Sequence, residues 1–270
     1  MRVERNLKLT LAYDGSDFHG WQVQPGKPTV QGVLAEALAR VTGVKASGEN
    51  ELPQGSGRTD AGVHALGQVA TVRTASPIPA ENLVIALNDV LPKSVRVLGV
   101  EEVGDDFHAR RSAKAKTYRY RIWRGGICPP LLARYVTHHP YPLDEQAMAE
   151  AAGAVVGEHD FTSFAAVDAE KNDEKGKDDE PRTGLRTGVR TNVRKIFSSA
   201  FRREGEELVY EIRGSGFLHH MVRNLAGTFL LVGKGTLAPA DVRAILEKKS
   251  RSAAGATAPA EGLYLVSVEY

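Results

Sequence analysis

Alternation of apolar and more polar residues constrains the fold of this chain more than any other feature of its sequence. From Leu7 to Tyr13 an apolar side chain stands at every second position. A period of two is typical of a strand that is buried on one face. We predict further strands over 68–73, 95–103, 116–123, 208–212 and 263–270.

Apolar residues at helical spacing lie between the predicted strands. Thr29 is expected to cap a helix, because apolar residues then recur on one helix face as far as Val41. Asp144 is expected to cap a second helix, which runs to about residue 155. Further helices are predicted over 82–88, 221–232 and 241–248.

Two segments of the chain resemble each other loosely. Residues 15–21 and 214–220 both begin with Gly-Ser, follow a predicted strand and precede an apolar helix. We therefore expect an α+β fold of two similar halves, each a mostly antiparallel sheet with helices on one face, with the active-site cleft between them. The predicted domains are 1–105 and 106–270, the second with a charged surface insertion near 168–190.

Composition favours a globular cytoplasmic protein. No stretch is long and apolar enough to span a bilayer, and the first residues lack the apolar core of a signal peptide. Cys128 is the single cysteine of the 270 residues, which excludes an internal disulfide and a cysteine-rich zinc site. The hydrophobic content of 42% is enough for a full core.

The net charge is only +2, but the charges are unevenly distributed. Residues 168–180 carry seven acidic side chains and three lysines, whereas 182–195 carry five cationic side chains and no acidic one. A solvated loop explains the acidic stretch. For the four arginines of the second stretch, binding to an RNA phosphate chain is an alternative to a solvated surface; they are Arg182, Arg186, Arg190 and Arg194.

The segment 55–64, Gly-Ser-Gly-Arg-Thr-Asp-Ala-Gly-Val-His, contains too many glycines for the interior of a helix or strand. Such a loop permits positive φ angles and close approach of another molecule. Within it, Arg58 stands two residues before Asp60, where a guanidinium favours an ionised carboxylate. An ionised, partly desolvated aspartate can act as nucleophile or base. On physical grounds alone a structural Asx-turn at Asp60 is an equal alternative.

Residues 57–64 closely resemble the catalytic motif of the TruA-type tRNA pseudouridine synthases. Other segments resemble further motifs of the same family, in the same order and over nearly the whole chain. They are 11–16, 20–22, 106–110, 116–120, 160–164, 219–224 and 261–265.

This resemblance implies a specific reaction. The family detaches a uracil from its ribose, turns the base and rejoins it through carbon, which yields pseudouridine. Its substrates are uridines at positions 38, 39 and 40 of tRNA, in the anticodon stem-loop. The resemblance implies a homodimer that binds tRNA and needs no cofactor or metal. In agreement with this expectation, the sequence carries neither a P-loop nor a dinucleotide-binding fingerprint.

The resemblance also implies roles for five residues. Asp60 is the expected catalytic nucleophile, which attacks the sugar or the base or removes a ribose proton. Arg58 is expected to fill the gap left by the extruded uridine, and Tyr118 to stack under the target base. Arg223 is expected to pair with Asp60, and Leu263 to close the uracil pocket. Without the family motifs, a core aromatic would be preferred for Tyr118. The alternative for Arg223 is a surface arginine, although the apolar run around it disfavours a wholly exposed position. A core leucine is equally acceptable for Leu263.

Two pairs of adjacent histidines, at 138–139 and 219–220, suggest a metal site at first sight. Adjacent side chains diverge on a strand or helix, so we expect no metal. Two other functions compete with the synthase. One is a catalytically inactive RNA-binding protein of the same fold, and the other is a hydrolase that uses Asp60 with His64.

Overall fold

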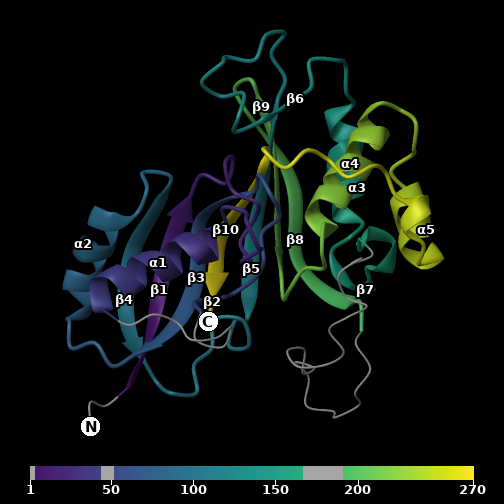
Figure 1. Ribbon diagram of the computed structural model, residues 1–270. Coiled ribbons are helices and arrows are strands. Elements are labelled where there is room, and N and C mark those ends of the chain that lie inside the picture. Colours follow the sequence, from purple (N-terminus) through teal and green to yellow (C-terminus); the bar gives the residue numbers. More distant parts are fainter. Residues whose placement is uncertain (1–3, 44–51, 167–190) are drawn as a thin grey trace. The chain divides into compact units, whose positions relative to one another are not determined.

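The computed structural model describes residues 4–43, 52–166 and 191–270, which form a mixed α+β fold with mostly antiparallel strand pairing (Figure 1). The chain divides into two compact units. The first comprises residues up to 119 together with 130–136 and 260–270, and the second comprises 120–129 and 137–259.

The first unit is built on a sheet in the order β4-β1-β3-β10. Strand β1 (Arg5–Tyr13) pairs antiparallel with both β3 (His64–Thr74) and β4 (Val95–Val103). The C-terminal strand β10 (Leu263–Glu269) joins the other edge of β3 in parallel, and the short β2 (Gln54–Gly55) also pairs with β3. The first unit therefore contains the strand that closes the chain.

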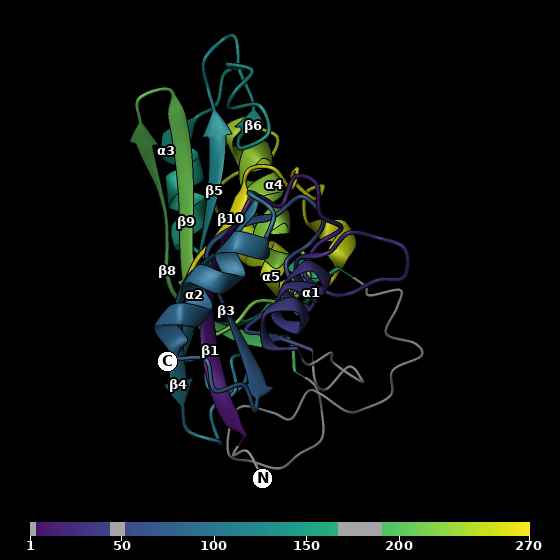
Figure 2. The same cartoon turned by 60° about the vertical axis from the view of Figure 1, so that its left-hand side comes forward.

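Helices α1 (Val30–Thr42) and α2 (Ala80–Val90) cover one face of this sheet (Figures 1 and 2). Thr29 caps α1 as predicted, because its hydroxyl accepts a hydrogen bond from the Gly32 amide over 3.3 Å. Gly43 ends the helix with a φ of 76°. The core beneath the helices is formed by fully buried leucines, namely Leu7, Leu9, Leu11, Leu34, Leu83 and Leu87.

The second unit contains an antiparallel sheet in which β8 (Val193–Glu204) pairs with β9 (Glu207–Gly214) and β7 (Gly157–Asp160). Strand β5 (Ala115–Trp123) begins in the first unit and ends in the second, where β6 (Thr137–His138) pairs with it in parallel.

Helices α3 (Glu145–Gly153) and α4 (Met221–Gly233) contact each other on one side of β8 and β9 (Figures 1 and 2). Helix α5 (Asp241–Lys248) and the 3-10 turns Thr162–Phe164 and Arg251–Ala253 complete the unit. Nearly every residue of α4 is buried. In the core, Phe229 of α4 meets Tyr210 edge-on, with the ring centroids 5.2 Å apart.

Most predicted elements are confirmed, and β4 and α5 have the predicted bounds. Asp144 caps α3 as predicted, but this helix already ends at Gly153. The prediction missed β8, because a register shift after Ile196 breaks the alternation of its mainly exposed residues. The similarity of two halves, the cleft between them and the domains 1–105 and 106–270 stay predictions. The charged segment near 168–190, with Arg182, Arg186 and Arg190, lies outside the described residues.

Across the described residues, no helix is both long and apolar enough to cross a bilayer.

The close packing of helix α4 predicts that adding a single methyl group to it strongly destabilises the protein. A Cβ atom added at Gly227 would overlap the carbonyl oxygen of Ala256, which belongs to backbone packed against the helix. We expect Gly227→Ala to lower the free energy of unfolding by about 1–3 kcal/mol or more, measured by urea denaturation. The control is Gly153→Ala in α3, where nothing lies within 4 Å of the added Cβ. Equal stability of the two variants would contradict the packing described here.

Candidate active site

The loop that carries Asp60 connects β2 to β3 and is held at both ends by backbone hydrogen bonds. The Ser56 amide donates to the carbonyl of Val69 over 2.7 Å. The carbonyl of Thr59 accepts from the Trp21 amide over 3.0 Å, and the Val63 amide donates to the carbonyl of Asp60 over 3.1 Å. The backbone on either side of Asp60 is therefore fixed, although the loop has no regular secondary structure.

A buried polar network lies beneath this loop. The Gln68 amide accepts from the Ser56 hydroxyl over 2.7 Å and donates to the carbonyl of Gly57 over 2.9 Å. Thr59 and Tyr13 share a hydrogen bond of 2.8 Å between their hydroxyls. Ser56, Thr59 and Gln68 are all buried. The network ties the loop to β1 and β3.

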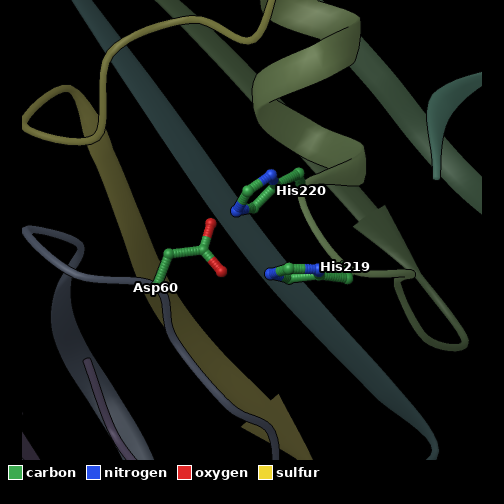
Figure 3. A group of neighbouring side chains, drawn as sticks. All are labelled: Asp60, His219 and His220. Atoms are coloured by element: carbon green, nitrogen blue, oxygen red, sulfur yellow. The ribbon is translucent and has the colours of Figure 1, made fainter. Parts of the chain in front are cut away.

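Asp60 is half-buried and extends from this loop beside β10 (Figure 3). Tyr118, on β5, is 8% exposed. Burial raises the pKa of the Tyr118 hydroxyl above its ordinary value, and the charges of Tyr13 and Asp60 raise it further. The Tyr118 hydroxyl therefore stays protonated at neutral pH. The negative charge of Asp60 contributes to this rise of its pKa. The structure thus brings these two predicted site residues together.

Arg58 and Leu263 belong to the same unit but differ in exposure. Arg58 is exposed on the loop, so its guanidinium is accessible to a large ligand. Leu263 is 5% exposed at the start of β10, where its amide donates to the carbonyl of Ala260 over 2.9 Å. The next residue, Tyr264, pairs with His64 at the end of the Asp60 loop.

Arg223 lies in the first turn of α4, in the second unit, and is half-buried. Its Nε donates to the carbonyl of Ala258 over 2.8 Å, and the Ala258 amide donates back to the carbonyl of Arg223 over 3.1 Å. The first hydrogen bond orients the guanidinium, and the second fixes the main chain of Arg223. Its pairing with Asp60 stays a prediction.

His219 and His220 immediately precede α4, and their imidazoles lie side by side with centroids 3.9 Å apart (Figure 3). The expectation that the two rings diverge is wrong for this pair. His220 adopts a left-handed conformation with a φ of 58°, which costs about 1–2 kcal/mol and turns its ring toward His219.

Both ring nitrogens of His64 have partners other than Asp60, so the imidazole is not placed to act as a base for Asp60. Its ring is 2% exposed, Nδ1 accepts from the Gly15 amide over 3.1 Å, and Nε2 lies 3.1 Å from the carbonyl oxygen of Arg134. The ring also stacks on Tyr264, with centroids 4.8 Å apart. Burial lowers the pKa of His64 despite the nearby Asp14. These contacts argue against a hydrolase that pairs Asp60 with His64.

Lys116 is a residue at this site that the sequence analysis did not assign. It is 7% exposed on β5, and its Nζ donates to the carbonyl of Ser56 in the loop. It stands two residues before Tyr118, so the period of two places both on one face of the strand. That alternation was a usable signal, but an isolated lysine in a strand is usually solvated.

Comparisons with known proteins identify the family of the chain. The sequence profile described as tRNA pseudouridine synthase matches residues 10–110 and 151–270. The chain belongs to the tRNA pseudouridine synthase family. Its curated relatives named tRNA pseudouridine synthase A include that of Solibacter usitatus, 50% identical over 98% of this chain and 100% of the relative. That of Anoxybacillus flavithermus is 44% identical over 98% of this chain and 99% of the relative.

The match to the synthase family includes the Asp60 loop, Arg223 and Leu263. Tyr118 and Lys116 lie between the two matched stretches, so their place in the site rests on the contacts described above.

The buried Tyr13 hydroxyl predicts a loss of stability in alkali. Burial raises the pKa of Tyr13 from 10.0 to about 12, against the opposing effect of its hydrogen bonds with Thr59 and Gln68. The unfolded chain releases this proton near pH 10, whereas the folded protein keeps it until about pH 12. Stability is therefore complete below pH 10 and falls above it, by up to about 1.4 kcal/mol per pH unit.

The measurement is the free energy of unfolding of the wild type and of Tyr13→Phe between pH 8 and about pH 12. The variant is less stable at neutral pH because Thr59 loses its partner, but we expect a shallower decline in alkali. Parallel declines for the two proteins would rule out the contribution of Tyr13.

Proposed function

We propose that this chain converts uridines of the tRNA anticodon stem-loop to pseudouridine, with Asp60 as the catalytic group. The observation that carries the proposal is the Asp60 loop, fixed from below by buried hydrogen bonds in a chain of the tRNA pseudouridine synthase family. The reaction is an isomerisation: the C1′–N1 bond breaks, a C1′–C5 bond forms, and a proton passes from C5 to N1. Atoms and electrons balance without a cofactor.

Each residue has a proposed part in this reaction. An ionised Asp60 attacks the sugar or the base or removes a ribose proton. Tyr118 lies under the target base, and its protonated hydroxyl can donate a hydrogen bond to the substrate. The exposed Arg58 enters the space left by the extruded uridine, since unstacking a base costs a few kcal/mol. Arg223 pairs with Asp60, and Leu263 closes the uracil pocket.

We further propose that the protein acts as a cytoplasmic homodimer that binds tRNA, with no metal and no membrane. Phosphate contacts then make the affinity for tRNA fall steeply as the salt concentration rises. A catalytically inactive RNA-binding protein of the same fold is the competing function. The intact Arg58-Thr59-Asp60 sequence in a structurally fixed loop favours the enzyme.

Asp60→Asn separates these two functions. The variant keeps the size of the side chain at a half-buried position, so it should fold and bind tRNA. We expect pseudouridine formation in unmodified tRNA transcripts, mapped by carbodiimide-blocked primer extension, to fall at least about a thousandfold.

The matched control is Asp105→Asn, which removes a carboxylate whose side chain is 83% exposed in the same unit. It should leave the activity unchanged. Bound tRNA without any pseudouridine in the wild type would favour the inactive RNA-binding protein. Release of free uracil would favour a hydrolase.

Arg58→Ala should act chiefly on substrate binding. If the guanidinium fills the space left by the uridine, its removal raises KM for tRNA about tenfold, with a smaller change in kcat. Arg111→Ala, at another exposed arginine of the first unit, is the control. A decrease of kcat at unchanged KM would assign Arg58 to the chemical step instead.

A further inference from the structure

The ammonium group of Lys116 lies inside the protein, against the catalytic loop. The side chain is 7% exposed, and Nζ donates a hydrogen bond to the carbonyl of Ser56. A Cβ atom at Gly57 would lie 2.8 Å from Nζ and 3.9 Å from the Tyr118 hydroxyl. A side chain at position 57 would therefore displace the ammonium from its present place beside the loop backbone.

The two carbonyl groups that precede Arg58 are held from two different strands. Lys116 on β5 holds the carbonyl of Ser56, and Gln68 on β3 holds the carbonyl of Gly57 over 2.9 Å. The polypeptide then continues through Thr59, which is bonded to Tyr13. The backbone immediately before Asp60 is thereby fixed by one cationic and several neutral side chains.

A neutral hydrogen-bond donor would occupy the position of Lys116 at a lower desolvation cost. Removing an ammonium from water is unfavourable, and replacing buried charged groups with apolar ones of similar size is often neutral or stabilising. A hydrogen bond to one carbonyl does not require a charge, because a neutral donor can also satisfy that carbonyl. The positive charge therefore needs a reason other than stability, and the loop beside it carries a carboxylate that acts on the neighbouring Tyr118.

We propose that Lys116 is a positioning residue for the proposed reaction: its buried ammonium holds the Ser56–Gly57 backbone and stabilises the negative charge of Asp60 throughout turnover. This assignment rests on the proposed function. The sequence suggests Arg58 as the cation for Asp60, but Arg58 is exposed and Lys116 is buried. In this arrangement the buried Lys116 stabilises the charge of Asp60, and the exposed Arg58 contacts the RNA.

The test compares kcat, KM for a tRNA transcript and the melting temperature for four variants of the full chain. Lys116→Met removes the charge and the hydrogen bond, Lys116→Gln keeps a donor without the charge, and Lys116→Arg keeps both. Lys114→Met is the matched control, since Lys114 stands two residues earlier and is exposed.

We expect Lys116→Met and Lys116→Gln each to lower kcat about a hundredfold, with KM within about twofold of the wild type. The melting temperature of Lys116→Gln should stay near that of the wild type, whereas that of Lys116→Met should fall modestly because the Ser56 carbonyl loses this donor. Lys116→Arg should recover at least about a tenth of the wild-type kcat, and the control should be fully active.

Three outcomes would overturn the assignment. If Lys116→Gln retains most of the wild-type kcat, the charge is dispensable. If Lys116→Met loses activity only in proportion to a lowered melting temperature, the role is structural. If Lys116→Met raises KM at unchanged kcat, the lysine contacts the RNA. A wild type that forms no pseudouridine would instead refute the proposed function, so the two failures are distinguishable.

Discussion

The side-chain amide of Gln68 is the interaction on which the candidate site depends. Its oxygen accepts from the Ser56 hydroxyl over 2.7 Å and from the Val69 amide over 3.1 Å. Its nitrogen donates to the carbonyl of Gly57 over 2.9 Å and lies 3.4 Å from the Tyr13 hydroxyl. A buried amide satisfied on both sides is stabilising, whereas one that loses a partner costs about 1–3 kcal/mol. The irregular loop therefore behaves as part of the sheet beneath it.

A fixed loop matters for catalysis because a carboxylate acts efficiently only when it does not have to reorganise during the reaction. The hydrogen-bonded backbone of its loop restricts the movement of Asp60, and burial restricts the movement of Tyr118. Arg223 is oriented in a similar way within the second unit, by its contacts with Ala258. In each unit, then, the proposed functional side chains are directed by groups that do not themselves react.

The sequence predicted those parts of the molecule that depend on local patterns. The alternation from Leu7 to Tyr13 became β1, and Thr29 and Asp144 cap the predicted helices. The glycines of the loop indicated where a carboxylate could be presented. Long-range contacts were not accessible in this way: nothing local shows that Lys116 meets Ser56 over 60 positions of chain, or that a positive φ at His220 brings two rings together. The family resemblance supplied the roles of single residues, and the structure supplied their surroundings.

The position of β10 has a consequence for biosynthesis. This strand pairs in parallel with β3, with Tyr264 opposite His64, although the whole second unit lies between them in the chain. A ribosome therefore makes the Asp60 loop well before the strand beside it. Until residues 263–269 emerge, one edge of β3 is uncovered and the ring of His64 lacks the tyrosine on which it stacks. Contacts so distant in sequence form slowly. The second unit can therefore fold during translation before the sheet of the first unit is complete.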